Sequence, residues 1–145
     1  MKRNYTISTL IISALLTVLF VYTASSKLMD FTTFQQQMIN QPIPKFLGMG
    51  LAWTLPPIEL ITGIMLVIPV WRKWGLILSF LLMLAFTGYI GLVWLNAFER
   101  VPCSCGGVLR RLGWGQHLVF NLMFLLLATA GLWIAPKDSE KLANT

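Results

Sequence analysis

GLILSFLLMLAFTGYIGLVWL, residues 75–95, is a run of 21 residues without a charged side chain. At 1.5 Å per helical residue, such a run is long enough to cross a hydrocarbon core of about 30 Å. Three further apolar runs of similar length occupy residues 6–24, 47–70 and 117–135. Because backbone polar groups in lipid must be hydrogen-bonded internally, each run is predicted to be a helix. The sequence therefore predicts an all-α membrane protein, a four-transmembrane-helix bundle that forms a single domain over residues 1–145.

The composition also indicates a membrane protein. Hydrophobic residues make up 57% of the chain and charged residues only 11%, with a mean hydropathy of +0.73, whereas soluble domains are about one quarter charged. The net charge of +6 is divided among short segments between the apolar runs, where basic residues anchor a chain to lipid headgroups. No segment forms a basic patch of the size that nucleic acid requires, so membrane lipid is the expected partner and nucleic acid is not.

The basic pair Lys2-Arg3 stands directly before the first apolar run and predicts that the N-terminus is cytoplasmic. Four spans then place both termini on the cytoplasmic side of the inner (plasma) membrane and the loop 96–116 on the exported side, where disulfides can form. An alternative is that residues 1–26 are a cleaved signal peptide, but the apolar run is long for that role. The favoured interpretation keeps it as the first of four spans in a multi-pass protein.

Cys103 and Cys105 are the only cysteines of the chain, and they lie in the predicted loop 96–116. A disulfide between positions two apart closes a very small ring, so it is expected to be strained and easily reduced. Arg110 and Arg111, in the same loop, favour the thiolate form that attacks disulfides. The pair is therefore predicted to be catalytic in thiol–disulfide exchange, with the arginines in support. A structural role in the loop is the alternative.

Glu59 lies within the apolar run 47–70, about one turn after Pro56-Pro57. The two prolines remove helix hydrogen bonds and predict a kink or break. An ionisable side chain at this depth is costly, so Glu59 is expected to face the bundle interior, a cavity or a partner. The sequence leaves two roles open for it, a catalytic one and a structural one as a buried hydrogen-bonding group.

Polar residues also stand at the edges of the first and last runs. Lys27 and Asp30 have helical i,i+3 spacing and are expected to pair with each other at the interface. His117 and Asn121 have i,i+4 spacing and share one face at the start of the last run. His117, the only histidine, can relay a proton to or from a thiol, or serve as a polar cap of the helix.

Metal binding is the remaining chemistry that these side chains allow. Cys103, Cys105 and His117 offer three candidate ligands, which is fewer than the closed set of four that structural zinc requires. No metal site is therefore predicted. Copper(I), which two thiolates can satisfy, stays open as an alternative role for the pair.

The order of these features resembles the MauE/DoxX group of small four-helix membrane proteins, particularly the MauE branch associated with methylamine utilisation. The resemblance rests on four segments taken in order along the chain: Ala24-Ser25-Ser26-Lys27-Leu28-Met29-Asp30 with Phe34, Leu55-Pro56-Pro57-Ile58-Glu59-Leu60 with Gly63, Cys103-Ser104-Cys105-Gly106, and Gln116-His117 with Asn121. The family loop commonly reads Cys-Gly-Cys-Phe-Gly, and its aromatic residue is missing from this chain.

The resemblance implies a role in disulfide formation or redox maturation of exported proteins, together with a thioredoxin-like partner. DoxX relatives are linked to quinone-coupled oxidation of sulfur compounds, so the resemblance also makes a quinone the candidate cofactor. The working hypothesis is a membrane thiol–disulfide redox protein. In it Cys103 and Cys105 cycle between dithiol and disulfide, His117 or Glu59 manages protons, and Lys27, Asp30 and Asn121 support the site.

One dithiol cannot serve a substrate and an electron acceptor at two separate places. A thioredoxin-fold protein or an exported substrate protein is therefore the expected partner. Two alternatives remain from other functional classes: a non-catalytic membrane subunit that docks or assembles a redox complex, and a copper(I)-handling membrane protein.

Overall fold

The structure is a computed structural model that describes the backbone of residues 2–97 and 113–143, and the side chains of residues 7–97, 113 and 115–135. It contains the helices α1 (Lys2–Met29), α2 (Phe31–Ile39), α3 (Lys45–Val67), α4 (Arg72–Trp94) and α5 (Trp114–Ala143). The described residues form no strand. The predicted all-α fold is confirmed. Cys103, Cys105, Arg110 and Arg111 lie outside the described residues.

Four of the helices are long and apolar enough to cross a membrane, over Ile7–Met29, Lys45–Val67, Arg72–Trp94 and Gly115–Ala135. Their bounds differ from the predicted runs by a few residues. The first helix continues to Met29 instead of ending at residue 24, and the last begins at Trp114 instead of residue 117. Polar residues can extend a helix beyond the apolar run because the intrahelical hydrogen bonds do not depend on side-chain hydropathy.

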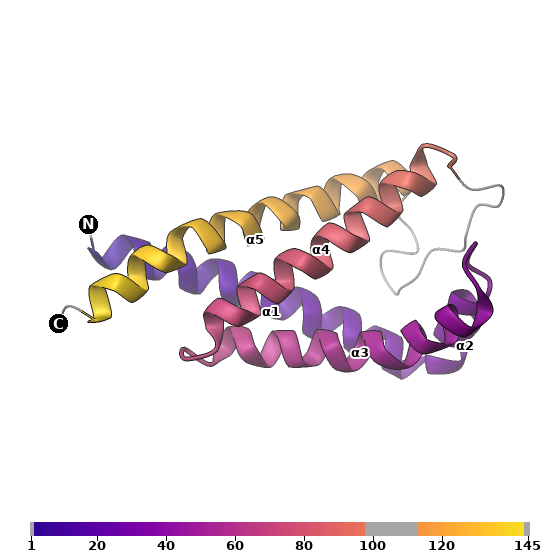
Figure 1. Cartoon of the computed structure of the whole chain (residues 1–145), viewed down its shortest axis with the longest axis horizontal. Helices are drawn as coiled ribbons and strands as arrows, with labels where there is room; N and C mark the ends of the chain where they lie inside the picture. The colour runs from indigo at the N-terminus through magenta and orange to yellow at the C-terminus, as the bar shows by residue number, and fades with distance from the viewer. Residues whose placement is uncertain (1, 98–112, 144–145) are drawn as a thin grey trace.

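The long helices form an antiparallel bundle (Figure 1). α1 packs mainly against α3 and α4 against α5, while contacts of α3 with α4 and of α1 with α5 close the arrangement. The start of α1 and the end of α5 lie at the same end of the bundle, and α2, the end of α4 and the start of α5 lie at the other (Figure 1). This second end is called the α2 end below.

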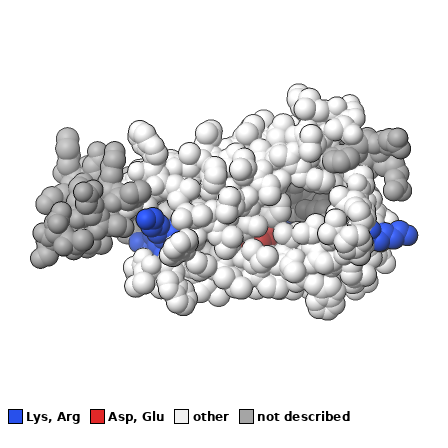
Figure 2. Space-filling model, viewed as in Figure 1, with Lys and Arg blue, Asp and Glu red and all other residues white. Residues whose placement is uncertain are grey.

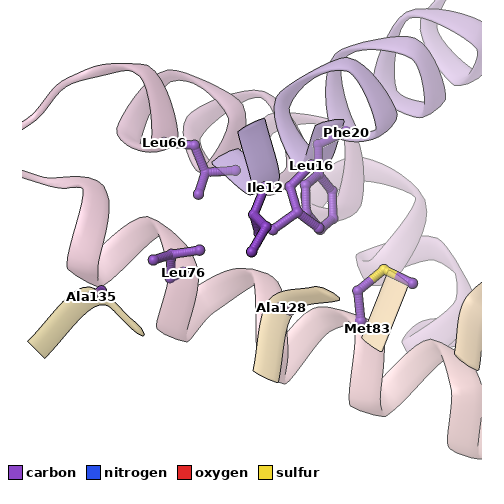
Figure 3. Close-up of a cluster of buried hydrophobic side chains, with 8 residues drawn as sticks. All are labelled: Ile12, Leu16, Phe20, Leu66, Leu76, Met83, Ala128 and Ala135. Carbon is purple, nitrogen blue, oxygen red and sulfur yellow. The ribbon is translucent and has the colours of Figure 1, made fainter. Parts of the chain in front are cut away.

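All four long helices contribute to a hydrophobic core (Figure 3). Its buried residues are Ile12, Leu16, Phe20, Leu66, Leu76, Met83, Ala128 and Ala135. Gly75 and Gly131 allow the close approach of the helices, since a Cβ would lie 2.9 Å from the Leu66 backbone nitrogen and 2.9 Å from Leu76 Cδ2 respectively. Small residues at such contacts are typical of helix packing within membranes.

The outer surface of the bundle is largely apolar. Side chains such as Val18, Leu126 and Trp133 are more than 60% exposed, and the face in Figure 2 shows little charge apart from basic atoms toward its two ends and a small acidic patch between them. Water would disfavour so large an apolar surface, whereas lipid tails accommodate it. The protein is therefore a multi-pass membrane protein in contact with lipid.

The helix α2 lies between the first two predicted spans. Asp30 begins it as N-cap, with Oδ1 accepting a hydrogen bond of 3.3 Å from the Thr33 backbone N–H. Phe34 and Met38, four residues apart, pack with Ala52 of α3. α2 thereby covers the first half of α3, where Gly48 lets the two backbones meet: a Cβ at Gly48 would lie 2.4 Å from Met38 O.

Of the kink or break predicted at Pro56-Pro57, the break does not occur. α3 continues through both residues from Lys45 to Val67. Each proline removes one backbone donor, but α3 stays helical on both sides of the pair and packs against α1 and α4. Pro56 itself is buried.

Candidate functional site

A cavity of about 490 Å³ lies between the long helices and α2. Its walls are mainly apolar and come from every helix of the bundle, with Phe20 from α1, Met38 from α2, Ile58 from α3, Phe86 from α4 and Phe120 from α5. A pocket of this size matches those that bind small organic molecules. The candidate site is thus an apolar chamber, and its chemistry depends on the few polar side chains that face it.

Lys27 and Glu59 both line this cavity and form an ion pair across α1 and α3. Lys27 Nζ lies 2.5 Å from Glu59 Oε1, and the two side chains are only 10% and 1% exposed. Glu59 therefore faces the interior, as its depth in the helix required. Lys27 stands in the last turn of α1, where a positive charge also complements the helix dipole.

Two aromatic rings flank the lysine. Lys27 Nζ lies 5.5 Å from the ring centroid of Phe34 and 5.4 Å from that of Phe86, within the range of cation–π attraction. The ammonium group thus has one carboxylate and two ring faces around it. These contacts join α1 to α2 and α4 as well as to α3, and they fix the position of the charge in the cavity wall.

The expected pairing of Lys27 with Asp30 is wrong. Asp30 is exposed and caps α2 through Thr33, whereas Lys27 turns inward to Glu59. The physical reason is the larger penalty for an unpaired charge in the interior: a buried carboxylate without a partner costs several kcal/mol, whereas an exposed one is solvated.

Other polar residues meet at the same cavity. Tyr89 Oη donates a hydrogen bond to Gln41 Oε1, which ties α4 to the segment after α2. His117 and Asn121 are 8% and 6% exposed, and both line the cavity from α5. Sequence reasoning selected Lys27, Glu59, His117 and Asn121 and missed Gln41 and Tyr89, for which only their polarity near apolar runs was a signal.

The two cysteines lie outside the described residues. Ala97 and Gly113 mark where the segment that carries them leaves and rejoins the described chain. Gly113 lies four residues before His117, and its carbonyl accepts a hydrogen bond of 2.9 Å from the His117 backbone N–H. Both attachment points flank the start of α5 and the end of α4, at the α2 end of the bundle.

Within the described part of the chain, no group of three or more His, Cys, Asp or Glu side chains is arranged to hold a metal ion. His117 is part of that described region, whereas the two cysteines are not. The copper(I) alternative involves the cysteine pair and stays a prediction.

The fold and the cavity together define a small multi-pass helical membrane protein with a buried ion pair in a central chamber. The model of the family described as "Methylamine utilisation protein MauE" matches residues 5–134. This range covers most of the chain, and the protein belongs to the MauE family. The match concerns MauE and does not show a relationship to DoxX. No curated protein and no solved structure matches the chain.

Proposed function

We propose that this protein is a thiol–disulfide redox protein of the inner membrane that supports disulfide formation or redox maturation of exported proteins in methylamine utilisation. Membership of the MauE family supports the process. The only two cysteines, Cys103 and Cys105, supply the chemistry. The observation that carries the proposal is that the segment bearing both cysteines joins the bundle beside His117, at the end where the polar groups of the cavity gather.

The exchange consists of two thiol–disulfide steps. A substrate thiolate attacks the Cys103–Cys105 bond, which forms a mixed disulfide and releases the other cysteine as a thiolate. The second substrate thiol then displaces the mixed disulfide, so the substrate gains a disulfide and the pair becomes a dithiol. A disulfide of a thioredoxin-fold partner reoxidises the dithiol by the same two steps and is itself reduced. Two electrons and two protons pass at each stage.

Proton transfer accompanies these steps because thiols must ionise to attack and thiolates must be protonated afterwards. His117 is the described titratable group that follows the cysteine segment most closely along the chain. Glu59 is the buried carboxyl group of the same cavity. These two groups are the proposed proton carriers. Lys27 is proposed to fix the carboxylate, and Asn121 to support His117. Arg110 and Arg111 are proposed to favour the thiolate.

The proposed orientation places both termini in the cytoplasm. The start of α1 and the end of α5 lie at one end of the bundle (Figure 1), so the two ends of the chain share one side of the membrane. Lys2-Arg3 before the first span assigns that side to the cytoplasm. The cysteine segment is then on the exported side, where substrate proteins fold.

Trapping of the mixed disulfide tests this function. Cys103→Ser and Cys105→Ser are made separately and produced in cells that express the neighbouring genes, and adducts are resolved on non-reducing gels and identified by mass spectrometry. We expect one variant to trap a covalent adduct and the other to trap little. The attacking cysteine forms a mixed disulfide with the partner protein, and this bond persists when the second, resolving cysteine is missing. Cys105, next to Gly106-Gly107, is the less hindered and is the proposed attacking thiol.

The control is the double variant Cys103→Ser/Cys105→Ser, which must give no adduct. An adduct that disappears on reduction and contains an exported or thioredoxin-fold protein supports the proposal. If neither single variant forms an adduct, the exchange function is wrong, and the docking-subunit interpretation takes its place.

A further inference from the structure

The cavity opens between α3 and α4. Leu51 and Thr54 of α3 and Ala85 of α4 line it and are exposed. All three residues belong to helices long and apolar enough to span the membrane. The opening therefore faces the side of the bundle that lipid surrounds, and a ligand can enter it from the bilayer.

One buried polar atom of the cavity lacks a partner. Glu59 Oε1 accepts from Lys27, but Glu59 Oε2 has no hydrogen-bond partner among the described residues, although the side chain is only 1% exposed. Buried polar atoms are almost always hydrogen-bonded, and an unmet carboxylate oxygen is especially costly. The site therefore calls for a hydrogen-bond donor from outside the helices.

The charge of the site limits what that donor can be. Lys27 and Glu59 compensate each other, and the other described residues that line the cavity are uncharged or apolar apart from His117. A charged ligand would leave an unpaired charge in an apolar chamber, which is strongly unfavourable. A neutral hydroxyl group satisfies Oε2 without adding charge, and its alkyl or aryl body matches the apolar walls.

We propose that this cavity binds an uncharged, lipid-soluble amphiphile whose hydroxyl head group donates a hydrogen bond to Glu59 Oε2 and whose apolar body leaves between α3 and α4. Gln41, Tyr89 and Asn121 offer further polar contacts to the head group. The chemistry fits a hydroquinone-type molecule and a hydroxyl-bearing neutral lipid equally well. The inference depends on described residues only and stands independently of the cysteines.

Paired probes test the inference. The wild-type protein in phosphatidylcholine nanodiscs is titrated with a decyl-substituted hydroquinone and with its dimethyl ether, and separately with monooleoylglycerol and its O-methylated analogue. Binding is followed by native mass spectrometry and by the unfolding midpoint. Within each pair the tail is the same, so the two probes differ only at the head group. We expect the hydroxyl form to bind at least about tenfold more tightly, because methylation removes the donor that a carboxylate oxygen requires.

A pair of variants locates the binding. Ala85→Phe places an aromatic side chain at the cavity wall, whereas Gly88→Phe adds the same side chain on α4 at a position where a Cβ would meet nothing within 4 Å. Both positions are exposed, so both variants are expected to fold. We expect Ala85→Phe to weaken binding at least about tenfold and Gly88→Phe to leave it unchanged.

Binding of the decyl hydroquinone without binding of monooleoylglycerol identifies a membrane electron carrier as the ligand class. Binding of monooleoylglycerol without binding of the hydroquinone identifies a neutral lipid. Either result, or both, supports the inference when the hydroxyl preference and the Ala85→Phe effect are present. Equal binding of hydroxyl and methylated probes, equal effects of the two phenylalanine variants, or no binding of any probe overturns it.

Discussion

Lys27 pairs with Glu59, 32 residues further along the chain, and not with Asp30, three residues away. The 2.5 Å contact joins α1 to α3 inside a largely apolar cavity. Both charges are thereby neutralised where little of either side chain is exposed. The pair also sets the rotation of the two helices about their axes, because both side chains must point to the same place between them.

The stability of the protein is expected to depend on both partners of the ion pair being present or absent together, more than on the presence of the two charges. Lys27→Met and Glu59→Leu, made separately, should each destabilise the protein by about 3 kcal/mol or more, since each leaves one buried charge without a partner. The double variant should recover most of this loss because it removes both charges. Unfolding in detergent, followed by circular dichroism, measures the cycle.

Asp30→Asn is the matched control for that cycle. Asparagine caps a helix as well as aspartate does, so this variant should change stability by less than about 0.5 kcal/mol. A loss for Asp30→Asn as large as that for Glu59→Leu, or additive losses in the double variant, would contradict the pairing seen between α1 and α3.

Glu59 is also expected to act in the redox cycle. Glu59→Gln keeps the size of the side chain and an oxygen that can accept from Lys27, but it cannot ionise. We expect this variant to insert into the membrane at the wild-type level and to lose at least about tenfold in the rate of substrate disulfide formation. If Glu59→Gln keeps full activity while Glu59→Leu fails, Glu59 is a structural hydrogen-bonding group.

The contact between α2 and α3 gives a third prediction. Gly48→Ala should destabilise the protein by about 1–3 kcal/mol, because the new Cβ would lie 2.4 Å from Met38 O and must displace α2. Gly50→Ala, on the same helix with nothing within 4 Å of the new Cβ, should be neutral or stabilising. Similar unfolding midpoints for the two variants would show that α2 is not held against α3.

The sequence was sufficient to predict the four long helices because membrane spans depend on length and hydropathy, which are local properties. α2 was not predicted, because a helix of nine residues is too short to span a membrane. Its signals were present: Asp30 as N-cap, and apolar residues at 31, 34 and 38, which repeat at helical spacing. These signals are weak beside the neighbouring apolar runs.

The site was harder to predict than the fold. Glu59 and Lys27 each stood out as charges near or within apolar runs, but the i,i+3 spacing to Asp30 favoured the wrong partner for Lys27. The correct pairing depends on how α1 and α3 are rotated against each other, which follows from the packing of core residues such as Phe20 of α1 and Leu66 of α3. Gln41 was missed for the same reason, since only the bundle brings it to Tyr89.

The proposed orientation predicts how the thiols label. After mild reduction, a membrane-impermeant thiol reagent added to intact cells should modify Cys103 or Cys105, because the cysteine segment is proposed to face the exported side. The variant Cys103→Ser/Cys105→Ser, which lacks any thiol, controls for background. Labelling that appears only after lysis would reverse the orientation and place the pair in a compartment where disulfides do not persist.

The central claim is that Cys103 and Cys105 cycle between dithiol and disulfide, and redox titration of the purified full-length protein tests it most directly. The protein is equilibrated in glutathione buffers of stepped potential and the thiol state is read by mass after alkylation. The small ring predicts a midpoint well above about −300 mV, the range below which structural disulfides of secreted proteins fall. A pair that stays oxidised in strongly reducing buffer, or that never forms a disulfide in oxidising buffer, would contradict the claim.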